Sequence, residues 1–400
     1  MRVGSFTSQR FTLAAMNQKQ VSINRLQEEI SSGKKLLKPS DDPAQVAATE
    51  NLDAAISRLG QYKKNGLQVE QRLQQEESVL NNLTDSLQRL KELTVAANSG
   101  TLNSNDLTAY RFEVGQIRNQ LLDYANTQTA SGEYLFSGAK NRSQPFSVLN
   151  GQVVYNGDQT QNRIQISDSR KVPDASTGDH IFQQIPSGNG HFNASADGAN
   201  TGTGIIGNDS VIDPSALTQA NYRIEFSSGN GFDVINSDTG ATVLGGQSFS
   251  ADSPIRFDGI EVAISGQPAA GDAFTISPSR NEDLFSSVDR FYQALSSAPQ
   301  SASERAAYHQ QVNQVMNGLD QALDHIGSVR SELGAKLKYI DNTRAENESL
   351  DLVLKQTRSK IEDTDLVRAI SDMKNESTTL EALRQTYTRF GSRTLFDYLR

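Results

Sequence analysis

Apolar residues recur every seven positions along much of the first hundred residues. One series consists of Leu52, Leu59, Gly66, Leu73, Leu80 and Leu87, and a second of Ala55, Tyr62, Val69, Glu76, Leu83 and Leu90. Paired series of this kind are the a and d positions of a coiled coil, in which each helix buries a narrow seam. The pattern predicts one helix from about residue 43 to 98, roughly 80 Å long at about 1.5 Å per residue, and therefore a rod.

Two further segments continue the pattern. After the polar stretch NSGTLNSND, apolar residues return at alternating spacings of three and four from Leu107 to Tyr124, which predicts a second rod helix antiparallel to the first. In the C-terminal third, one seven-residue phase consists of Val312, Leu319, Ile326, Leu333, Ile340, Leu354 and Ile361. Asn347 occupies the remaining slot of that phase, where a buried Asn would fix the register at a cost in stability.

Both ends of the chain carry apolar stripes of the same kind. The N-terminal stripe consists of Met16, Ile23, Leu26 and Ile30, and the C-terminal stripe of Leu366, Ile370, Met373, Leu380, Leu383, Tyr387 and Phe390. The C-terminal stripe is out of phase with the rod before it, and the sequence EDTD at 362–365 lies at the shift. We therefore predict a joint between two helical units there, and we expect the two stripes to supply assembly contacts.

The short sequence KPSDDP at 38–43 interrupts two helical patterns. Its adjacent carboxylates could hold a metal ion, but helix capping explains every residue of the run. Pro39 disfavours a helical conformation at the residue before it and so ends the first helix. Asp42 is a typical N-cap, and Pro43 suits the first position of the next helix.

Between about residues 141 and 281 the composition changes. Gly, Ser, Asn and Asp become frequent, short alternating runs such as NYRIEF and FDVIN appear, and NSDTG and FDGIEV have the character of hairpin turns. The sequence therefore predicts a mainly α protein with a β-rich domain inserted between N- and C-terminal segments that form a long antiparallel coiled-coil rod. The expected limits are 1–40 and 362–400 for the terminal assembly helices, 41–140 and 282–361 for the rod, and 141–281 for the β-rich insert.

Composition narrows the possible functions. The 400-residue chain has a formal net charge of −9 and contains neither Cys nor Trp. An acidic chain with scattered cations is poorly suited to nucleic acid, and the lack of Cys excludes disulfides and thiolate chemistry. The N-terminus lacks the apolar core of a cleaved secretory signal and no window approaches a membrane span, so we expect a cytoplasmic protein or one exported without a cleaved signal, with no membrane insertion.

No sequence motif indicates catalysis. GTGIIG at 202–207 matches a dinucleotide fingerprint in letters, but neither the strand before it nor the helix after it is predicted. The four histidines are dispersed, without the spacing of a metal site. We therefore expect no catalytic residue, metal or cofactor, and a protein that is not an enzyme. The run GEYLFSG at 132–138 is expected to be a buried strand that follows a helix ending at Gly132.

Three segments together resemble the flagellin superfamily of bacterial flagella. They are SSGKKLLKPSDDPAQVA at 31–47, GEYLFSG at 132–138 and the C-terminal RFGSRTLFDYLR, and SRKVPDASTGDHIF at 169–182 also looks like a segment of this superfamily. The resemblance covers roughly residues 1–140 and 282–400. Within the superfamily, the combination of SDDP with GEYLFSG is most similar to the hook-associated proteins at the hook–filament junction.

The resemblance implies a mechanical function. It implies a structural adaptor that joins the flagellar hook, through the preceding hook-associated protein, to the flagellin filament, with subunits arranged in a ring and packed by their terminal helices. It also implies export through the flagellar type III apparatus, with an export chaperone as a further partner, and an extracellular location. A filament-forming flagellin and a surface-binding adhesin based on the β-rich insert are the alternatives.

Overall fold

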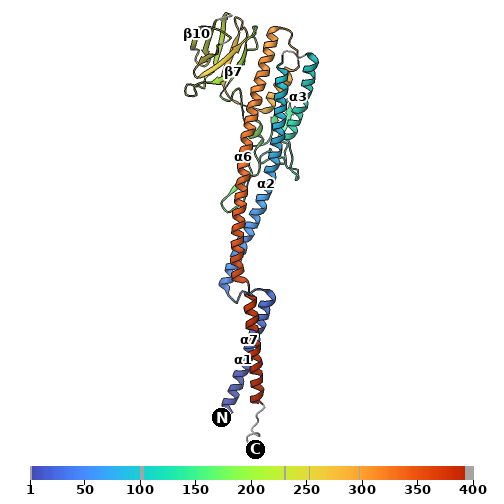
Figure 1. Cartoon of the computed structure of the whole chain (residues 1–400), viewed down its shortest axis with the longest axis vertical. Helices are drawn as coiled ribbons and strands as arrows, with labels where there is room; N and C mark the ends of the chain where they lie inside the picture. The colour runs from blue at the N-terminus through green and yellow to red at the C-terminus, as the bar shows by residue number, and fades with distance from the viewer. Residues whose placement is uncertain (1, 100–102, 229–230, 252, 297, 392–400) are drawn as a thin grey trace, which may run out of the picture. The chain divides into compact units, whose positions relative to one another are not determined.

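The computed structural model describes residues 2–99, 103–228, 231–251, 253–296 and 298–391. The chain divides into two compact units. The terminal unit consists of Met1–Lys64 and Thr343–Arg400, and the central unit of Asn65–Asn342. The divisions fall inside two long helices, α2 (Pro43–Ala97) and α6 (Ala302–Glu362), so both helices contribute to both units (Figure 1).

The helices of the central unit share one continuous apolar core. The later part of α2 and the first part of α6 pack with α3 (Ser104–Ala125) and α5 (Leu284–Ala294) around a single apolar cluster. The Tyr308 hydroxyl donates to the Ala97 carbonyl at 2.9 Å, and Lys91 pairs with Asp320, so α2 and α6 run antiparallel. The predicted rod, with its two N-terminal helices and its C-terminal partner, is therefore confirmed.

The seven-residue seams are the buried positions of this core. The fully buried seam residues include Leu73, Leu80, Leu83, Leu87 and Leu90 of α2 and Val312, Leu319 and Ile326 of α6. Full burial of a Leu side chain contributes about 1.5–3 kcal/mol. Glu76 occupies a seam position as well and is equally buried, which the apolar pattern alone does not explain.

The chain from residue 126 to 186 joins the same core. Its short elements are β1 (Phe146–Leu149), β2 (Gln152–Tyr155), β3 (Arg163–Gln165), β4 (Lys171–Pro173), α4 (Gly178–Phe182) and β5 (Ile185–Pro186). β1 pairs with β2, β3 with β4, and β5 with β14 (Asn281–Glu282), all antiparallel. Phe146 and Phe182 pack against each other and against Phe285 of α5. The first third of the segment predicted as a β-rich insert is thus part of the helical core.

The remaining strands form a β domain with a core of its own. The strands are β6 (Phe192–Ala196), β7 (Ile205–Val211), β8 (Tyr222–Ser228), β9 (Gly231–Asn236), β10 (Thr242–Ser248), β11 (Ile255–Phe257), β12 (Ile260–Ser265) and β13 (Ala273–Pro278). A five-stranded antiparallel sheet has the order β10-β9-β8-β13-β6, and a three-stranded one the order β11-β12-β7. Residues of both sheets share one apolar cluster, and Tyr222 of β8 packs against Phe257 of β11.

Turn residues set the strand register in this domain. FDGIEV forms the β11–β12 hairpin, in which Phe257 pairs with Ile260. Asp258 and Gly259 have positive φ values of 42° and 79°, the conformation that a two-residue hairpin turn requires. NSDTG likewise connects β9 to β10. Both hairpin predictions are confirmed.

GEYLFSG differs from its prediction. The helix before it, α3, ends at Ala125 rather than at Gly132, and Asn126 is its C-cap. The run forms turns, with a single bridge between Gln128 and Tyr134, because Gly132 and Gly138 at its two ends adopt positive φ. The prediction of a strand is therefore wrong, although Leu135 and Phe136 are buried as expected.

The terminal unit contains two helix pairs. α1 (Arg2–Ser32) packs along α7 (Leu366–Gly391), and the first part of α2 lies along the last part of α6, where Lys63 pairs with Glu348 and Asp53 with Arg358. Both pairs are antiparallel, because residue numbers rise along one helix as they fall along the other. The domain limits expected from the sequence differ from these units and remain a prediction.

Candidate assembly interface

The α1–α7 pair in the terminal unit contains most of the two predicted apolar stripes. Ile23 and Leu380 are buried, together with Ala369. The half-buried members are Met16, Leu26, Ile30, Met373, Leu383 and Tyr387. A Lys19–Glu376 ion pair of 2.7 Å closes the edge of the seam. These residues therefore serve first to hold the two helices of one chain together.

Two predicted assembly residues lie outside this seam. Leu366 is 47% exposed and Ile370 is 50% exposed, although both belong to α7. The side chain of Phe390 is outside the described residues. Leu366 and Ile370 are thus free to contact another molecule while the α1–α7 pair stays closed.

Further exposed apolar side chains lie on the terminal unit, and the sequence analysis did not select them. They are Phe11, Leu13 and Val21 of α1, Leu350, Leu352 and Val353 of α6, and Val367 of α7, which is 81% exposed. The sequence could have indicated these residues, because they are large and apolar but do not fall on the seven-residue phase that forms the seam. Large exposed apolar side chains of this kind mark candidate contacts with a partner, so these residues of three helices, which we call the terminal apolar surface, are the candidate interface.

The joint between the two helix pairs is built from backbone hydrogen bonds. α1 ends at Ser32, and Gly33 follows with a positive φ of 73°. The Lys35 amide donates to the Glu362 carbonyl at 2.8 Å, and the Thr364 amide donates to the Gly33 carbonyl at 2.9 Å. The sequence EDTD, where the apolar phase was predicted to shift, thus lies beside the residues that follow the end of α1.

Carboxylates cap the helices that start at this joint. Pro39 lies in the turn before α2, which begins at Pro43. The Asp42 Oδ1 atom accepts the amides of Ala44 and Gln45 at 3.1 and 3.0 Å. Asp365 accepts two amides at the start of α7 in the same way. Asn347, the expected register residue, is half-buried in α6.

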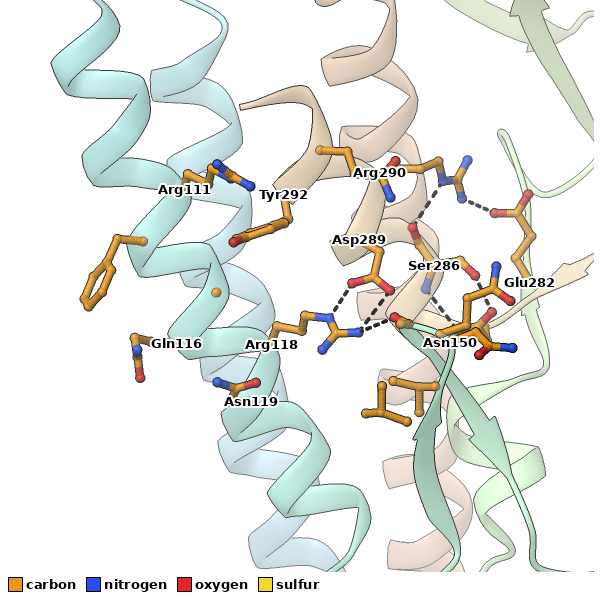
Figure 2. Close-up of a pocket in the computed structure, with 18 of the residues that line it drawn as sticks. Arg111, Gln116, Arg118, Asn119, Asn150, Glu282, Ser286, Asp289, Arg290 and Tyr292 are labelled. Carbon is orange, nitrogen blue, oxygen red and sulfur yellow. Dashed lines mark hydrogen bonds and ion pairs between the residues drawn. The ribbon is translucent and has the colours of Figure 1, made fainter. Parts of the chain in front are cut away.

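A groove lies on the central unit between α3, the β1–β2 hairpin and α5 (Figure 2). Its volume is about 1220 Å³. Arg118 on α3 pairs with Asp289 on α5 and donates to the Gly151 carbonyl at 3.0 Å, which ties helix, hairpin and helix together. The guanidinium carbon of Arg111 lies over the Tyr292 ring, 4.5 Å from its centroid. Figure 2 shows both residues in the lining of the groove.

The groove has the chemistry of a packing surface. Glu282 pairs with Arg290, so that pair and Arg118–Asp289 are both neutralised internally. Among the residues that the structure describes, no group of three or more His, Asp or Glu side chains is arranged to hold a metal ion. The Ser286 hydroxyl donates to the Asp283 carboxylate in this groove, but Asp283 is the N-cap of α5 and also accepts the Ser286 amide at 2.9 Å, so this contact belongs to the helix cap.

The GTGIIG segment binds one of the protein's own carboxylates. The buried Asp272 accepts the amides of Thr201 and Gly202, the latter at 3.0 Å, and that of Ala269 at 2.8 Å. A Cβ atom at Gly202 would come within 2.5 Å of the Asp272 carboxylate. Gly202 is therefore required by the loop that precedes strand β7. The strand begins inside the run, at Ile205.

Comparison with known proteins agrees with this architecture. The profile of the bacterial flagellin N-terminal helical region matches residues 4–141, and that of the flagellar hook-associated protein 1 D2-like domain matches residues 195–278. The solved structure of flagellar hook-associated protein-3 from Legionella pneumophila is 35% identical, with a TM-score of 0.74, over 78% of this chain and 98% of that one. Xanthomonas campestris FlgL is 32% identical, with a TM-score of 0.72, over 77% and 99%.

These matches define the class first as flagellin-like. The chain belongs to the flagellar hook-associated protein 3 family of that superfamily. Flagellar hook-associated protein 3 of Escherichia coli K12 is 35% identical over 160 residues, which is 40% of this chain and 50% of that protein. The chain therefore aligns with about half the length of this curated relative. Within the described part of the chain, no helix is long and apolar enough to span a membrane.

Proposed function

We propose that this protein is a structural adaptor that joins the flagellar hook to the flagellin filament by packing of its terminal helices. The observation that carries the proposal is its likeness, over almost the whole of a solved chain, to hook-associated protein 3. The exposed apolar side chains of the terminal unit support it, because an adaptor needs a surface that is buried only in the assembly. The work of such a protein is mechanical.

The proposed partners follow from this role. They are other copies of the chain arranged as a ring, the preceding hook-associated protein and flagellin, at the hook–filament junction outside the cell. The flagellar type III export apparatus and an export chaperone are the proposed partners before assembly. Each side of a ring-forming subunit meets a different side of its neighbour, so two distinct surfaces are needed. The terminal apolar surface and the central groove are candidates for such contacts.

A deletion strain tests the proposal. Without this chain we expect complete hooks that lack filaments, with flagellin released into the medium, and we expect the wild-type gene to restore filaments. Val367→Asp should not restore them. Its charge lies in the first turn of α7, where a carboxylate favours the helix, so the fold should be retained.

Thr379→Asp is the matched control, because it places the same charge on an exposed polar position of the same helix. It should restore filaments, and circular dichroism should show equal helix content in both variants. Long filaments formed by the purified chain alone would instead identify a filament-forming flagellin. Filaments of normal number in the deletion strain would contradict both the adaptor function and the flagellin function.

A further inference from the structure

Strand β7 is the last strand of a three-stranded sheet with the order β11-β12-β7, so among the described strands only β12 is hydrogen-bonded to it. The outer edge of such a strand presents backbone amides and carbonyls that can pair with a strand of another chain. On β7 these groups meet side-chain amides instead. The Ile206 amide donates to Gln310 Oε1 at 2.7 Å, and the Ile206 carbonyl accepts from Asn313 Nδ2 at 3.2 Å.

The pairing of β7 with β12 explains why Ile206 faces α6. Ile206 lies opposite Ile264 in the antiparallel ladder. Opposite residues in such a ladder alternate between those that exchange both hydrogen bonds and those whose backbone groups point away from each other. Ile206 is of the second kind, since both of its backbone groups bond to α6. Gln310 and Asn313 are three residues apart and therefore lie on one face of the helix.

A β-bulge moves the next outward-facing group of β7 to Asp209. The register shifts between Val262 and Ile264 of β12, where β7 has one residue more than its partner. The Asp209 carbonyl accepts from Asn189 Nδ2 at 3.4 Å. The Oδ1 atom of Asn189 accepts two backbone amides of the turn that leads into β6, at 3.0 and 2.9 Å. This orients the Asn189 side chain so that its Nδ2 group faces β7.

The two α6 side chains are held in place as well. Gln310 is only 6% exposed. Asn98, which follows α2, donates from Nδ2 to Asn313 Oδ1 at 3.3 Å, so Asn313 presents its Nδ2 group to β7. His309 Nδ1 in turn donates to Asn98 Oδ1 at 2.5 Å. Polar side chains in buried positions cost free energy unless they are hydrogen-bonded, and both α6 amides are satisfied by Ile206.

Other ends of the two sheets have different protection. Strand β10 ends the five-stranded sheet and has two register shifts against β9, with Gly246 at a positive φ of 62°. Strand β11 ends the three-stranded sheet and contains only 3 residues. Irregular edges and short edge strands both oppose pairing with another chain. Strand β7 has 7 residues, so its length does not protect its outer edge.

We propose that Gln310, Asn313 and Asn189 act as a substitute strand that closes the outer edge of β7 to pairing with another copy of the chain. The two α6 amides supply one acceptor and one donor at Ile206, as a neighbouring strand would. The excluded partner is the β7 edge of a second copy, because two identical edges can pair antiparallel about a two-fold axis. This inference does not depend on the proposed function.

Amide-resolved hydrogen exchange on the full chain tests the closure. Gln310→Met keeps the length of the side chain but removes the acceptor, so the Ile206 amide should exchange about tenfold faster or more. Gln311→Met, at the exposed neighbouring position, is the matched control and should leave Ile206 unchanged. The Ile224 amide in β8 should stay protected in both variants, which shows that the β domain is folded. Asn313→Leu, which removes the donor, repeats the test if Gln310→Met does not fold.

Sedimentation velocity over a concentration series tests the excluded pairing. Gln310→Met combined with Asn313→Leu should associate more strongly than wild type and than Gln311→Met. Addition of Ser210→Lys, at an exposed position of β7, should reverse this gain, because a lysine on an edge strand opposes pairing. Unchanged exchange at Ile206, an opened edge without added association, or association that Ser210→Lys does not reverse would each overturn the substitute strand.

Discussion

The two units use the same seven-residue pattern and bury it to very different extents. In the central unit the seam of α2 and α6 is covered by α3, α5 and the chain from residue 126 to 186, and residues such as Leu80 and Leu319 have no exposed surface. In the terminal unit two helices cover only each other's facing stripes, and Val21 and Val367 on the other faces are largely exposed. The period of a helix identifies its apolar face, but the number of covering elements decides whether burial is complete.

Charge separates the two units as well. The terminal unit contains 20 basic and 16 acidic residues, a formal net charge of +4. The central unit contains 18 basic and 31 acidic residues, a formal net charge of −13. Self-repulsion of the acidic unit should keep the free chain soluble, while the weakly charged terminal unit with its apolar surface is better suited to association.

The largest expected difference between the units is in local stability. We expect the amides of α1 and α7 to exchange at least about a thousandfold faster than those of α2 between Leu80 and Leu93 in the free chain at micromolar concentration. The physical reason is that two helices buried on one stripe each receive too little packing to offset the entropy of ordering. Hydrogen exchange with mass spectrometry measures both regions in one experiment.

The same measurement indicates whether assembly completes the terminal unit. Addition of the assembled hook-associated partner should slow exchange in α1 and α7 and leave the central core unchanged. Equal protection of α1 and the α2 core in the free, monomeric chain would show that the helix pair is stable alone. Folding of the ends would then not be coupled to assembly.

A pair of leucine substitutions gives the next largest effect. Leu83→Ala in the fully buried seam should lower the free energy of unfolding by about 2–5 kcal/mol, through lost burial and the cavity left behind. Leu352→Ala, at a position that is 57% exposed in the terminal unit, should change it by less than about 0.5 kcal/mol. Denaturant unfolding measures both. A cost of about 2 kcal/mol or more for Leu352→Ala in the monomer would mean that this face is already covered within one chain.

Much of the fold is visible in the sequence because its helices follow strict rules. The seven-residue period located α2 between Pro43 and Ala97, and Gly-containing turns located the hairpins. The segment from 126 to 186 was not predictable in the same way, since its short elements are held by long-range contacts such as Phe146 with Phe285. No local pattern distinguishes a strand of the β domain from a turn that packs on the helices.

The candidate interface was only partly predictable for a related reason. Heptad phase selected Ile23 and Leu380, which the chain buries within itself. Exposed residues such as Leu352 and Val367 break the phase and were missed, whereas Leu366 and Ile370 were selected by it and are exposed as well. Glu76 contacts Ser176, and His325 contacts His180. These partners are a hundred or more residues apart in the sequence, so residue spacing could not reveal the contacts.

The smallest predicted effect concerns the start of α2, where the terminal unit depends on one cap. Asp42→Ala removes the acceptor for the Ala44 and Gln45 amides and should cost about 1 kcal/mol, seen as about fivefold faster exchange in the first turn of α2. Glu50→Ala, at an exposed position two turns later, is the control and should have little effect. A calorimetric titration with divalent cations separates capping from the metal alternative. Saturable micromolar binding that disappears in Asp42→Ala would contradict the capping role, because both carboxylates of the pair would then serve a ligand rather than the helix.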